Sequence, residues 1–390
     1  MKKRFIAIIT LWILVDIYFF TAVLRLTTYP LIYLIYWLIE AVVMGALVYS
    51  VTKGNTNLLS RLMAPMLVLF VPKLFGSIIL LLEDITRLFR RFPVRSYAVS
   101  EIAVLVSALL FLILLYGITR GRHRYKVHKV TLYFSDLPKA FDGFRITQLS
   151  DIHAGSFIDK KGVQKGIDLV NAQKSDLILF TGDLVNNQAA EMDPWIPVFS
   201  QLKAAYGKFS ILGNHDYGDY MRWENEELKS ANLNRLKEIH SEIGFQLMLN
   251  ESRSIKKEGD SIELIGVENW GKGGFHKYGD LDKAIASVPK NAFKILMSHD
   301  PSHWEAIILD HPQPIHLTLS GHTHGMQFGF EVFGIKWSPI KYMYKQWAGL
   351  YVRNNQYLYV NRGFGFLGLK GRVGIWPEIT VITLKCKQNA

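Results

Sequence analysis

Five short clusters of Asp, Asn and His in the last two-thirds of the chain carry side chains that can hold metal ions. They are Asp151-Ile152-His153, Gly182-Asp183, Gly213-Asn214-His215-Asp216, His299 and Gly321-His322-Thr323-His324. Carboxylate and amide oxygens combined with imidazole nitrogens suit divalent Mn, Fe, Zn or Co, and the set does not choose among them. One such cluster is commonly a solvated loop or turn, whereas five in one chain predict a site for metal chemistry.

The spacing within the clusters suggests how they would share ions. In Asp-x-His, alternate side chains of an extended backbone point the same way, so Asp151 and His153 can bind one ion together. The glycine before Asp183 lets the backbone turn sharply, and a carboxylate placed there can bridge two cations. Asn214 adds a neutral carbonyl oxygen, and His299 and His322 add imidazoles.

Apolar runs precede nearly every cluster and predict the strands that would position them, at residues 144–149, 177–180, 209–212, 293–297 and 315–319. Amphipathic stretches predict helices at 161–173, 194–206 and 225–243. Further strands are expected at 126–134, 262–267, 357–360 and 379–384. This alternation indicates an α/β domain whose later strands add a partly antiparallel second sheet. Because such folds place their sites beyond the carboxyl ends of strands, we expect the clusters to meet there.

In this order the five clusters resemble the signature of the calcineurin-like metallophosphoesterases, across residues 145–324. The strand at 357–360 with Asn361-Arg362-Gly363, and the later Pro377-Glu378-Ile379, look like the C-terminal part of one bacterial branch. The resemblance therefore covers residues 126–385. One departure is Gly325-Met326-Gln327, where a second glycine often follows the first. Met326 lies beside the site, so this departure concerns substrate shape and not metal binding.

The resemblance implies an α/β fold, a four-layer αββα sandwich that holds two divalent metal ions. Carried over by position, the first ion would be bound by Asp151, His153, Asp183 and His324. The second would be bound by Asp183, Asn214, His299 and His322. Two such ions can activate a bridging hydroxide for attack on a phosphoester. His215 would face the substrate as a leaving-group acid or a donor to developing charge. Asp216 would orient His215 by contacting the ring nitrogen of His215 that does not face the substrate.

Other polar residues are expected to have lesser roles. The remaining histidines lie off the motifs, and we expect solvated or capping roles for His123, His128, His240, His276, His303, His311 and His316. Glu268-Asn269 fits a turn better than a substrate contact. Three basic residues near the C-terminus could contact a phosphate, namely Arg362, Lys370 and Arg372.

Four apolar stretches precede residue 120, at 5–24, 31–51, 62–82 and 98–118, each about 20 residues long, the length that crosses a bilayer. A cleaved signal peptide would explain only the first. We therefore predict four transmembrane helices in residues 1–119, a basic connector with an edge strand in 120–143, and the phosphoesterase domain in 144–390. Asp16, Glu40 and Lys73 lie within the spans and predict an ion pair between helices, with a lipid-headgroup or ion site as the alternative.

The charge distribution bears on partners and orientation. The 390-residue chain has a formal net charge of +12, and its basic residues do not form a block of like charge. We therefore expect no nucleic-acid partner, and we expect a basic surface that lies near anionic lipid. Its single cysteine, Cys386, excludes a Cys-ligated zinc site.

The basic residues that flank the four spans predict their orientation. Ten Lys and Arg lie on the side of the membrane that holds both ends of the bundle, and five lie on the other side. This bias predicts a cytoplasmic catalytic domain. Residues 84–94 could form an amphipathic stretch on the opposite leaflet.

Together these features predict a multi-pass integral protein of a bacterial-type cell membrane that hydrolyses a phosphoester or pyrophosphate bond. Its partners would be the lipid bilayer and a phosphorylated, lipid-linked substrate, and its oligomeric state stays open. One alternative is a membrane receptor or scaffold with a ligand-binding phosphoesterase-like domain. Another is a phosphodiesterase that acts on soluble nucleotides. The aromatic and basic stretch 328–351 could be either an ordinary strand pair with a core loop or a rim against lipid headgroups.

Overall fold

The computed structural model describes residues 2–274 and 276–387, and the chain divides into two compact units at Thr119 and Arg120. Each unit is described by itself. The side chains of Lys2, Lys3 and Arg4, which the orientation prediction includes, lie outside the described part.

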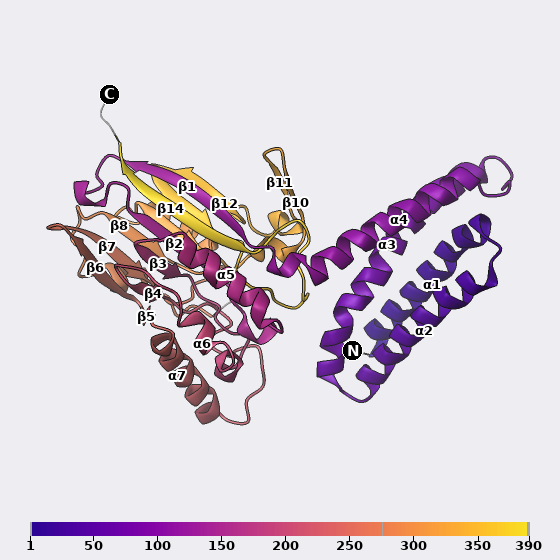
Figure 1. Ribbon diagram of the computed structural model, residues 1–390, viewed down its shortest axis with the longest axis horizontal. Helices are drawn as coiled ribbons and strands as arrows, with labels where there is room; N and C mark the ends of the chain where they lie inside the picture. The colour runs from indigo at the N-terminus through magenta and orange to yellow at the C-terminus, as the bar shows by residue number, and fades with distance from the viewer. Residues whose placement is uncertain (1, 275, 388–390) are drawn as a thin grey trace. The chain divides into compact units, whose positions relative to one another are not determined.

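The first unit consists of four helices, α1 (Lys2–Leu26), α2 (Pro30–Thr52), α3 (Thr56–Leu88) and α4 (Tyr97–Thr119) (Figure 1). All four are long and apolar enough to cross a membrane, which confirms the predicted spans. Their apolar side chains surround each helix and do not form one stripe, as is typical of helices that face lipid. The unit is therefore a transmembrane bundle.

Three charged residues within the bundle form a buried cluster. Lys73 of α3 donates to Asp16 Oδ1 of α1 at 2.6 Å and also pairs with Glu40 of α2. Glu40 in turn accepts from the indole of Trp12 at 3.0 Å. The predicted ion pair between helices is thus confirmed, and it links three helices because Lys73 serves both acids.

The predicted amphipathic stretch at 84–94 is not a separate helix. Its first residues complete α3, and residues 89–96 are not helical. Arg95 lies 2.8 Å from Asp84 and 3.2 Å from Glu83, and Arg87 also pairs with Asp84. These arginines are therefore paired with acids of the same region.

The second unit contains two six-stranded sheets within its described residues. One has the order β1 (Lys126–Phe134), β14 (Glu378–Cys386), β2 (Arg145–Leu149), β3 (Leu177–Phe180), β4 (Lys208–Ser210) and β5 (Gln246–Leu247). The other has the order β12 (Gly349–Arg353), β13 (Gln356–Val360), β9 (Leu317–Ser320), β8 (Lys294–Met297), β7 (Asp260–Gly266) and β6 (Glu251–Lys257). Strands β2 to β5 are parallel, as are β7, β8, β9 and β13, whereas β12 and β6 pair antiparallel at the edges. The expected partly antiparallel second sheet is confirmed.

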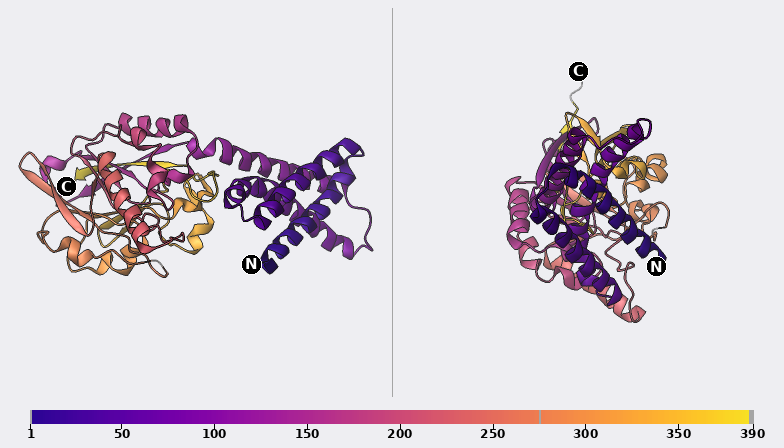
Figure 2. Two further views of the ribbon diagram at one scale, coloured as in Figure 1. Left: turned by 90° about the horizontal axis from the view of Figure 1, so that it is seen from below. Right: turned by 90° about the vertical axis from the view of Figure 1, so that its right-hand side faces the viewer.

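The sheets pack face to face, and helices cover their outer faces (Figure 2). Alternate residues of both sheets, such as Leu179 and Leu264, form the core between them. The first sheet is covered by α5 (Lys160–Ala172), α6 (Ile196–Phe199) and α7 (Glu226–Glu242). The second is covered by α8 (Leu281–Ile285) and α9 (Ser302–Ala306). These layers form the predicted αββα sandwich.

Two regions differ from the sequence-based expectation. The helix predicted at 194–206 is α-helical only over Ile196–Phe199, because the chain turns after Ser200 to reach β4. The stretch after the last motif forms a hairpin that no periodicity predicted, β10 (Phe330–Val332) and β11 (Ile335–Trp337). It is followed by a short 3-10 helix, η7 (Pro339–Tyr342).

Candidate metal centre

The five clusters lie just beyond the carboxyl ends of parallel strands in both sheets. Asp151 and His153 follow β2, Asp183 follows β3, Asn214 follows β4, His299 follows β8, and His322 and His324 follow β9. The structure brings six of these side chains into two groups, in each of which the ligand atoms all lie within 4.8 Å of one another. The groups are Asp151, His153 and His324, and Asp183, His299 and His322.

The first group is buried and rich in lone pairs. The Nε2 atoms of His153 and His324 are 3.0 Å apart, and His324 Nε2 lies 3.3 Å from Asp151 Oδ1. Each residue is buried. Burying three converging donors of this kind is costly unless a cation binds them, so the arrangement fits one metal ion.

The second group shares its carboxylate with the first. His299 Nε2 lies 3.2 Å from Asp183 Oδ2 and 3.1 Å from Asn214 Oδ1, which is 2.9 Å from His322 Nδ1. The same Asp183 oxygen lies 3.5 Å from His153 Nε2 of the first group. Asp183 thus stands between the two groups, as a bridging ligand must.

The backbone of the clusters adopts a conformation that most residues avoid. Asp151, His153, Asp183, His322 and His324 all have φ between 49° and 69°. The left-handed region costs a residue other than glycine on the order of 1 kcal/mol. Hydrogen bonds hold the strained turn after β2, with Ile152 N and His153 N donating to Asp183 O at 2.8 and 3.1 Å. Strain retained in this way is typical of functional sites.

Two motif glycines are required for space. A Cβ at Gly213 would collide with the carboxylate of Asp183, and one at Gly321 would collide with Ser150 Oγ and the carboxylate of Asp151. Their backbones therefore approach the acidic ligands more closely than any other residue type would allow.

Burial and neighbouring charge shift the pKa values of the predicted ligands. Burial lowers the pKa of His153 to about 3 and raises the pKa of Asp151 to about 6. Burial also acts to lower the pKa of His299, but the carboxylates of Asp183 and Asp151 outweigh it and raise that pKa to about 10. Burial acts to raise the pKa of Asp183, yet His299 and His215 hold it well below the usual range. Without an ion, the proton on His299 neutralises Asp183.

Metal binding is therefore expected to release protons, more of them at low pH. At about pH 7.5, an ion must displace the proton of His299 (pKa about 10), while Asp151 (pKa about 6) is already ionised. At about pH 5.5, Asp151 is mostly protonated too, so release rises from about one proton toward two and affinity falls. Calorimetric titration of chelator-treated protein with Mn²⁺, in buffers of different ionisation enthalpy, measures this. Proton release that does not change between the two pH values would contradict the assignment.

His215 lies at the edge of the centre with one ring nitrogen fixed. Its Nδ1 donates to the carbonyl of Asn186 at 2.8 Å, and its backbone amide donates to Asp183 Oδ1 at 2.9 Å. The ring is half-buried and meets His153 edge to face, with centroids 5.0 Å apart. Nε2 is consequently the nitrogen left for a substrate.

Asp216 does not contact the ring of His215, which corrects the expectation that it orients this histidine. Its carboxylate instead accepts four backbone N–H groups, from Asp183, Leu184, Val185 and Gly213, at 2.8 to 3.2 Å. A short acidic side chain beside paired loops satisfies their buried amides better than water could. Asp216 therefore joins the loop that carries Asp183 to the loop that carries Asn214.

Two tyrosines outside the five clusters contact the centre. Tyr344 Oη lies 2.9 Å from His322 Nε2 and 3.3 Å from Asp300 Oδ2. Tyr220 Oη accepts from Asn214 Nδ2 at 2.9 Å. Neither belongs to a motif, although Tyr344 lies in the aromatic stretch after Gly-His-Thr-His.

The two arginines expected at a phosphate are bound to protein groups instead. Arg362 is buried between Glu378 and Glu331. Arg372 is wholly buried, donates to the carbonyl of Gly365 at 2.8 Å and lies 3.2 Å from His324 Nδ1. A substrate phosphate would have to displace these partners, so the expectation is wrong for the two arginines, and Arg372 supports His324. The phosphate contact of Lys370 stays a prediction.

The remaining polar residues match the expectation only in part. His240 and His303 are buried and not solvated, and their Nδ1 atoms lie 2.9 Å from Ser210 Oγ and 2.9 Å from Ser298 Oγ. Glu268 accepts from Tyr217 at 3.1 Å and from Asn250 at 2.7 Å, which is a structural role. Within the described residues, no histidine outside the motifs belongs to either donor group.

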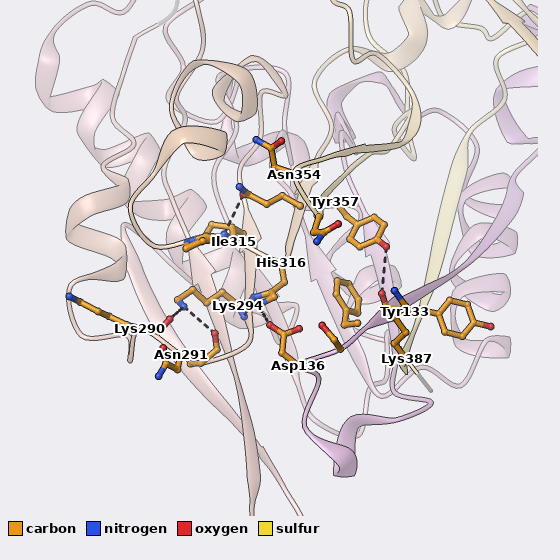
Figure 3. A pocket seen from close by; sticks show the side chains of 16 residues that line it. Tyr133, Asp136, Lys290, Asn291, Lys294, Ile315, His316, Asn354, Tyr357 and Lys387 are labelled. Atoms are coloured by element: carbon orange, nitrogen blue, oxygen red, sulfur yellow. Dashed lines mark hydrogen bonds and ion pairs between the residues drawn. The ribbon is translucent and has the colours of Figure 1, made fainter. Parts of the chain in front are cut away.

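The cavities of the second unit lie either beside the metal centre or at the opposite ends of the strands. A cavity of about 590 Å³ is lined by Lys294 at the start of β8, His316 before β9 and Phe134 at the end of β1 (Figure 3). It lies at the opposite ends of β8 and β9 from the metal ligands and does not belong to the centre. Two others border the centre, one of about 550 Å³ at Tyr344 and one of about 100 Å³ at Asn214 and Tyr220.

Comparison with known proteins gave consistent matches. Residues 3–122 match a family described as "Probable Calcineurin-like phosphoesterase, transmembrane domain", and residues 144–326 match "Calcineurin-like phosphoesterase". The chain is 32% identical over 267 residues to the uncharacterized metallophosphoesterase YkuE of Bacillus subtilis, covering 67% of this chain and 86% of YkuE. It is 28% identical over 294 residues to a transmembrane protein with metallophosphoesterase domain from Danio rerio, covering 74% of this chain and 63% of that protein.

Proposed function

Since this chain belongs to the calcineurin-like metallophosphoesterases, a family of metal-dependent phosphoric ester hydrolases, we propose that it cleaves a phosphoester or pyrophosphate bond in a lipid-linked substrate. The observation that carries the proposal is the position of Asp183 between two groups of buried donors. The four membrane-spanning helices then restrict the reaction to the neighbourhood of a bilayer.

The residues around Asp183 fit two divalent ions, whose native identity among Mn, Fe, Zn and Co stays open. Such ions would supply Lewis-acid stabilisation of the phosphoryl group and a lowered pKa for a bound water. Asp151, His153 and His324 would hold one ion, Asn214, His299 and His322 the other, and Asp183 both. The carbonyl of Thr181, 2.7 Å from His299 Nδ1, fixes that ring so that Nε2 faces Asp183.

We assign to His215 a role in contacting the substrate and not in binding metal. With Nδ1 held by Asn186, its Nε2 can donate a proton to the leaving oxygen or a hydrogen bond to a phosphoryl oxygen. Asp216 acts through the backbone, because its four amide contacts set the distance between the loops of Asp183 and Asn214.

The cavity beside Tyr344 supports a phosphorylated substrate with an apolar part. It has Lys272 and Lys345 in its lining, and the side chain of Lys345 is 82% exposed although it lies 3.7 Å from Glu305. Met343, which is 71% exposed, adds an apolar surface to the same lining. Cations beside apolar area suit an anionic lipid headgroup with part of its chain.

The full chain in nanodiscs tests the proposal. Turnover of generic phosphomono- and diesters that requires Mn²⁺ is expected, together with faster cleavage of a lipid-linked pyrophosphate than of its water-soluble analogue. Folded, metal-loaded protein without any turnover would favour a receptor or scaffold. A preference for soluble nucleotides would reject the lipid-linked substrate while leaving the hydrolase intact.

Replacing His215 by Asn is expected to lower kcat by roughly 10²-fold or more, because proton donation to the leaving group is lost. The loss should be large for an alkyl phosphate and small for a nitrophenyl phosphate, whose leaving group needs no proton. Metal content measured by mass spectrometry should not change. His311→Asn, a histidine paired with Asp282 outside both donor groups, is the control. Equal losses on both substrates would contradict a proton-donor role.

We place the catalytic unit in the cytoplasm, on the side favoured by the ten basic residues that flank the spans. A green fluorescent protein fused to the C-terminus should fluoresce, whereas a fused alkaline phosphatase should be inactive. The reverse pattern would overturn the orientation.

A further inference from the structure

We propose that the β10–β11 hairpin is a membrane-docking element, which places its turn at Phe333 among the headgroups of an anionic bilayer. Figure 1 shows the hairpin projecting from the body of residues 120–390. This interaction surface is separate from the metal centre, and the inference does not rest on the proposed function.

The hairpin exposes its apolar face and turns its polar face toward the domain, which is the reverse of an ordinary surface hairpin. Successive side chains of a strand point to opposite faces, so Phe330 and Val332 share one face with their partners Trp337 and Ile335. This apolar face is turned outward, with Phe330 46%, Val332 51% and Ile335 67% exposed. Such a face has no partner within the described chain and would otherwise stand in water.

The polar face of the hairpin is held against the domain. Glu331 accepts from Arg362 Nε at 2.9 Å, and Arg362 is itself buried. Lys336 donates to the carbonyl of Ala348 and lies over the ring of Tyr351 at 4.8 Å. These contacts fix the hairpin with its apolar face outward.

A phenylalanine at position 333 favours neither the stability nor the solubility of the protein. The turn residues Phe333 and Gly334 have φ of 51° and 79°, a two-residue turn that favours Asn, Asp or Gly. Two other hairpins of the chain have the same turn geometry and polar first residues, Glu258 before Gly259 and Asn354 before Asn355. Phe333 is 100% exposed, and its backbone conformation is strained for an aromatic residue. We therefore infer that its side chain contacts a partner outside this chain.

The base of the hairpin lies beside the first residues of the second unit, which directly follow the last membrane-spanning helix in the chain. Helix α4 ends at Thr119, and Gly121, two residues later, packs against Arg372 and Trp376 of the second unit. Two residues span at most about 7 Å. The segment after Arg372 pairs with the base of the hairpin through a bridge between Val373 and Phe328 and a 3.0 Å bond from Gly329 N to Val373 O.

Charge beside the hairpin matches an anionic lipid surface. The loop after β11 exposes Lys341, whose ammonium lies 5.0 Å from the ring of Tyr342, and that ring is 75% exposed. Exposed Lys345 follows. Lysines next to aromatic side chains are typical of surfaces that lie on headgroups, where the cation meets phosphate and the ring enters the interface. Because the helices tether the domain, even a small apolar tip would stay engaged.

A depth measurement on the full chain tests the proposal. The cysteine of the wild type is replaced (Cys386→Ser), Ile335→Cys is labelled with an environment-sensitive fluorophore, and the protein is placed in nanodiscs containing anionic lipid and a shallow nitroxide-labelled lipid. We expect a blue-shifted emission and loss of most of the fluorescence to the nitroxide. Glu258→Cys, in the hairpin turn of matching backbone, is the control and should keep its emission in water and its intensity.

A second variant separates docking by the hairpin from insertion by the label. Adding Phe333→Asp to the Ile335→Cys protein should restore most of the fluorescence, while nitrophenyl phosphate turnover reports that the domain is folded. Equal quenching at positions 335 and 258, or no quenching at either, would overturn the proposal. Protection of the label without nitroxide quenching, accompanied by crosslinking between chains, would show that a second copy covers the hairpin and would also overturn it.

Discussion

Replacing Asp183 by Asn is expected to abolish metal-dependent phosphoesterase activity, with a fall in kcat of about 10³-fold or more. The Oδ2 atom of Asp183 lies 3.2 Å from His299 Nε2 and 3.5 Å from His153 Nε2, so both groups share this carboxylate oxygen. An amide at this position would lack the negative charge that we propose attracts two cations. Lewis-acid stabilisation is worth several kcal/mol, and each 1.4 kcal/mol is about tenfold in rate.

The substitution should also change the metal content. Without the shared carboxylate, the protein is expected to retain fewer than two ions per chain after gel filtration, as measured by mass spectrometry of the metals. Asp193→Asn changes an exposed acid that lies 3.9 Å from Arg235 and is the matched control. Wild-type turnover or two tightly held ions in the Asp183 variant would refute the bridging assignment.

The convergence of the proposed ligands could be predicted because each one follows a buried strand. A strand end is marked in the sequence by an apolar run that stops at a polar residue, as at Phe180 before Asp183 and Leu319 before His322. Parallel strands of one sheet must present such ends at the same edge. The proximity of the clusters after β2, β3 and β4, and of those after β8 and β9, is therefore a consequence of topology, whereas the face-to-face packing of the two sheets brings these two sets together.

The contacts of individual polar side chains could not be predicted in the same way. Asp216 adjoins His215 in sequence, and adjacency suggested a contact between their side chains. Consecutive residues in a turn point in different directions, and the buried amides of two loops offered Asp216 better partners. Arg362 similarly looked available for phosphate, because its partners Glu331 and Glu378 are 31 and 16 residues away in the chain.

The tyrosines at the centre and the β10–β11 hairpin illustrate a second limit. Tyr344 reaches His322 only because the hairpin and η7 bring the chain back to the site, and short strands of three residues leave no period to recognise. The aromatic stretch was ambiguous for this reason. The structure shows both a strand pair and an exposed apolar face in it.

Replacing Lys73 by Met is expected to destabilise the helical bundle by about 3–5 kcal/mol, the cost of leaving buried charge uncompensated. Lys73 is 8% exposed, and its ammonium contacts Asp16 at 2.6 Å and also Glu40. Without it, two carboxylates would face each other among apolar helices, where water cannot solvate them. Heating the protein in detergent and measuring the fraction that remains monodisperse should show a lower midpoint than for the wild type.

A triple variant separates charge from packing. Asp16→Asn and Glu40→Gln, added to Lys73→Met, remove all three charges while keeping an oxygen acceptor for the indole of Trp12, which donates to Glu40 at 3.0 Å. If the loss in the single variant is electrostatic, the triple variant should regain most of the lost midpoint, because neutral groups of similar volume replace a buried ion network at little cost. A triple variant as unstable as Lys73→Met would instead assign the loss to the packing of the lysine stem. A single variant as stable as the wild type would mean that the charged cluster does not hold the helices together.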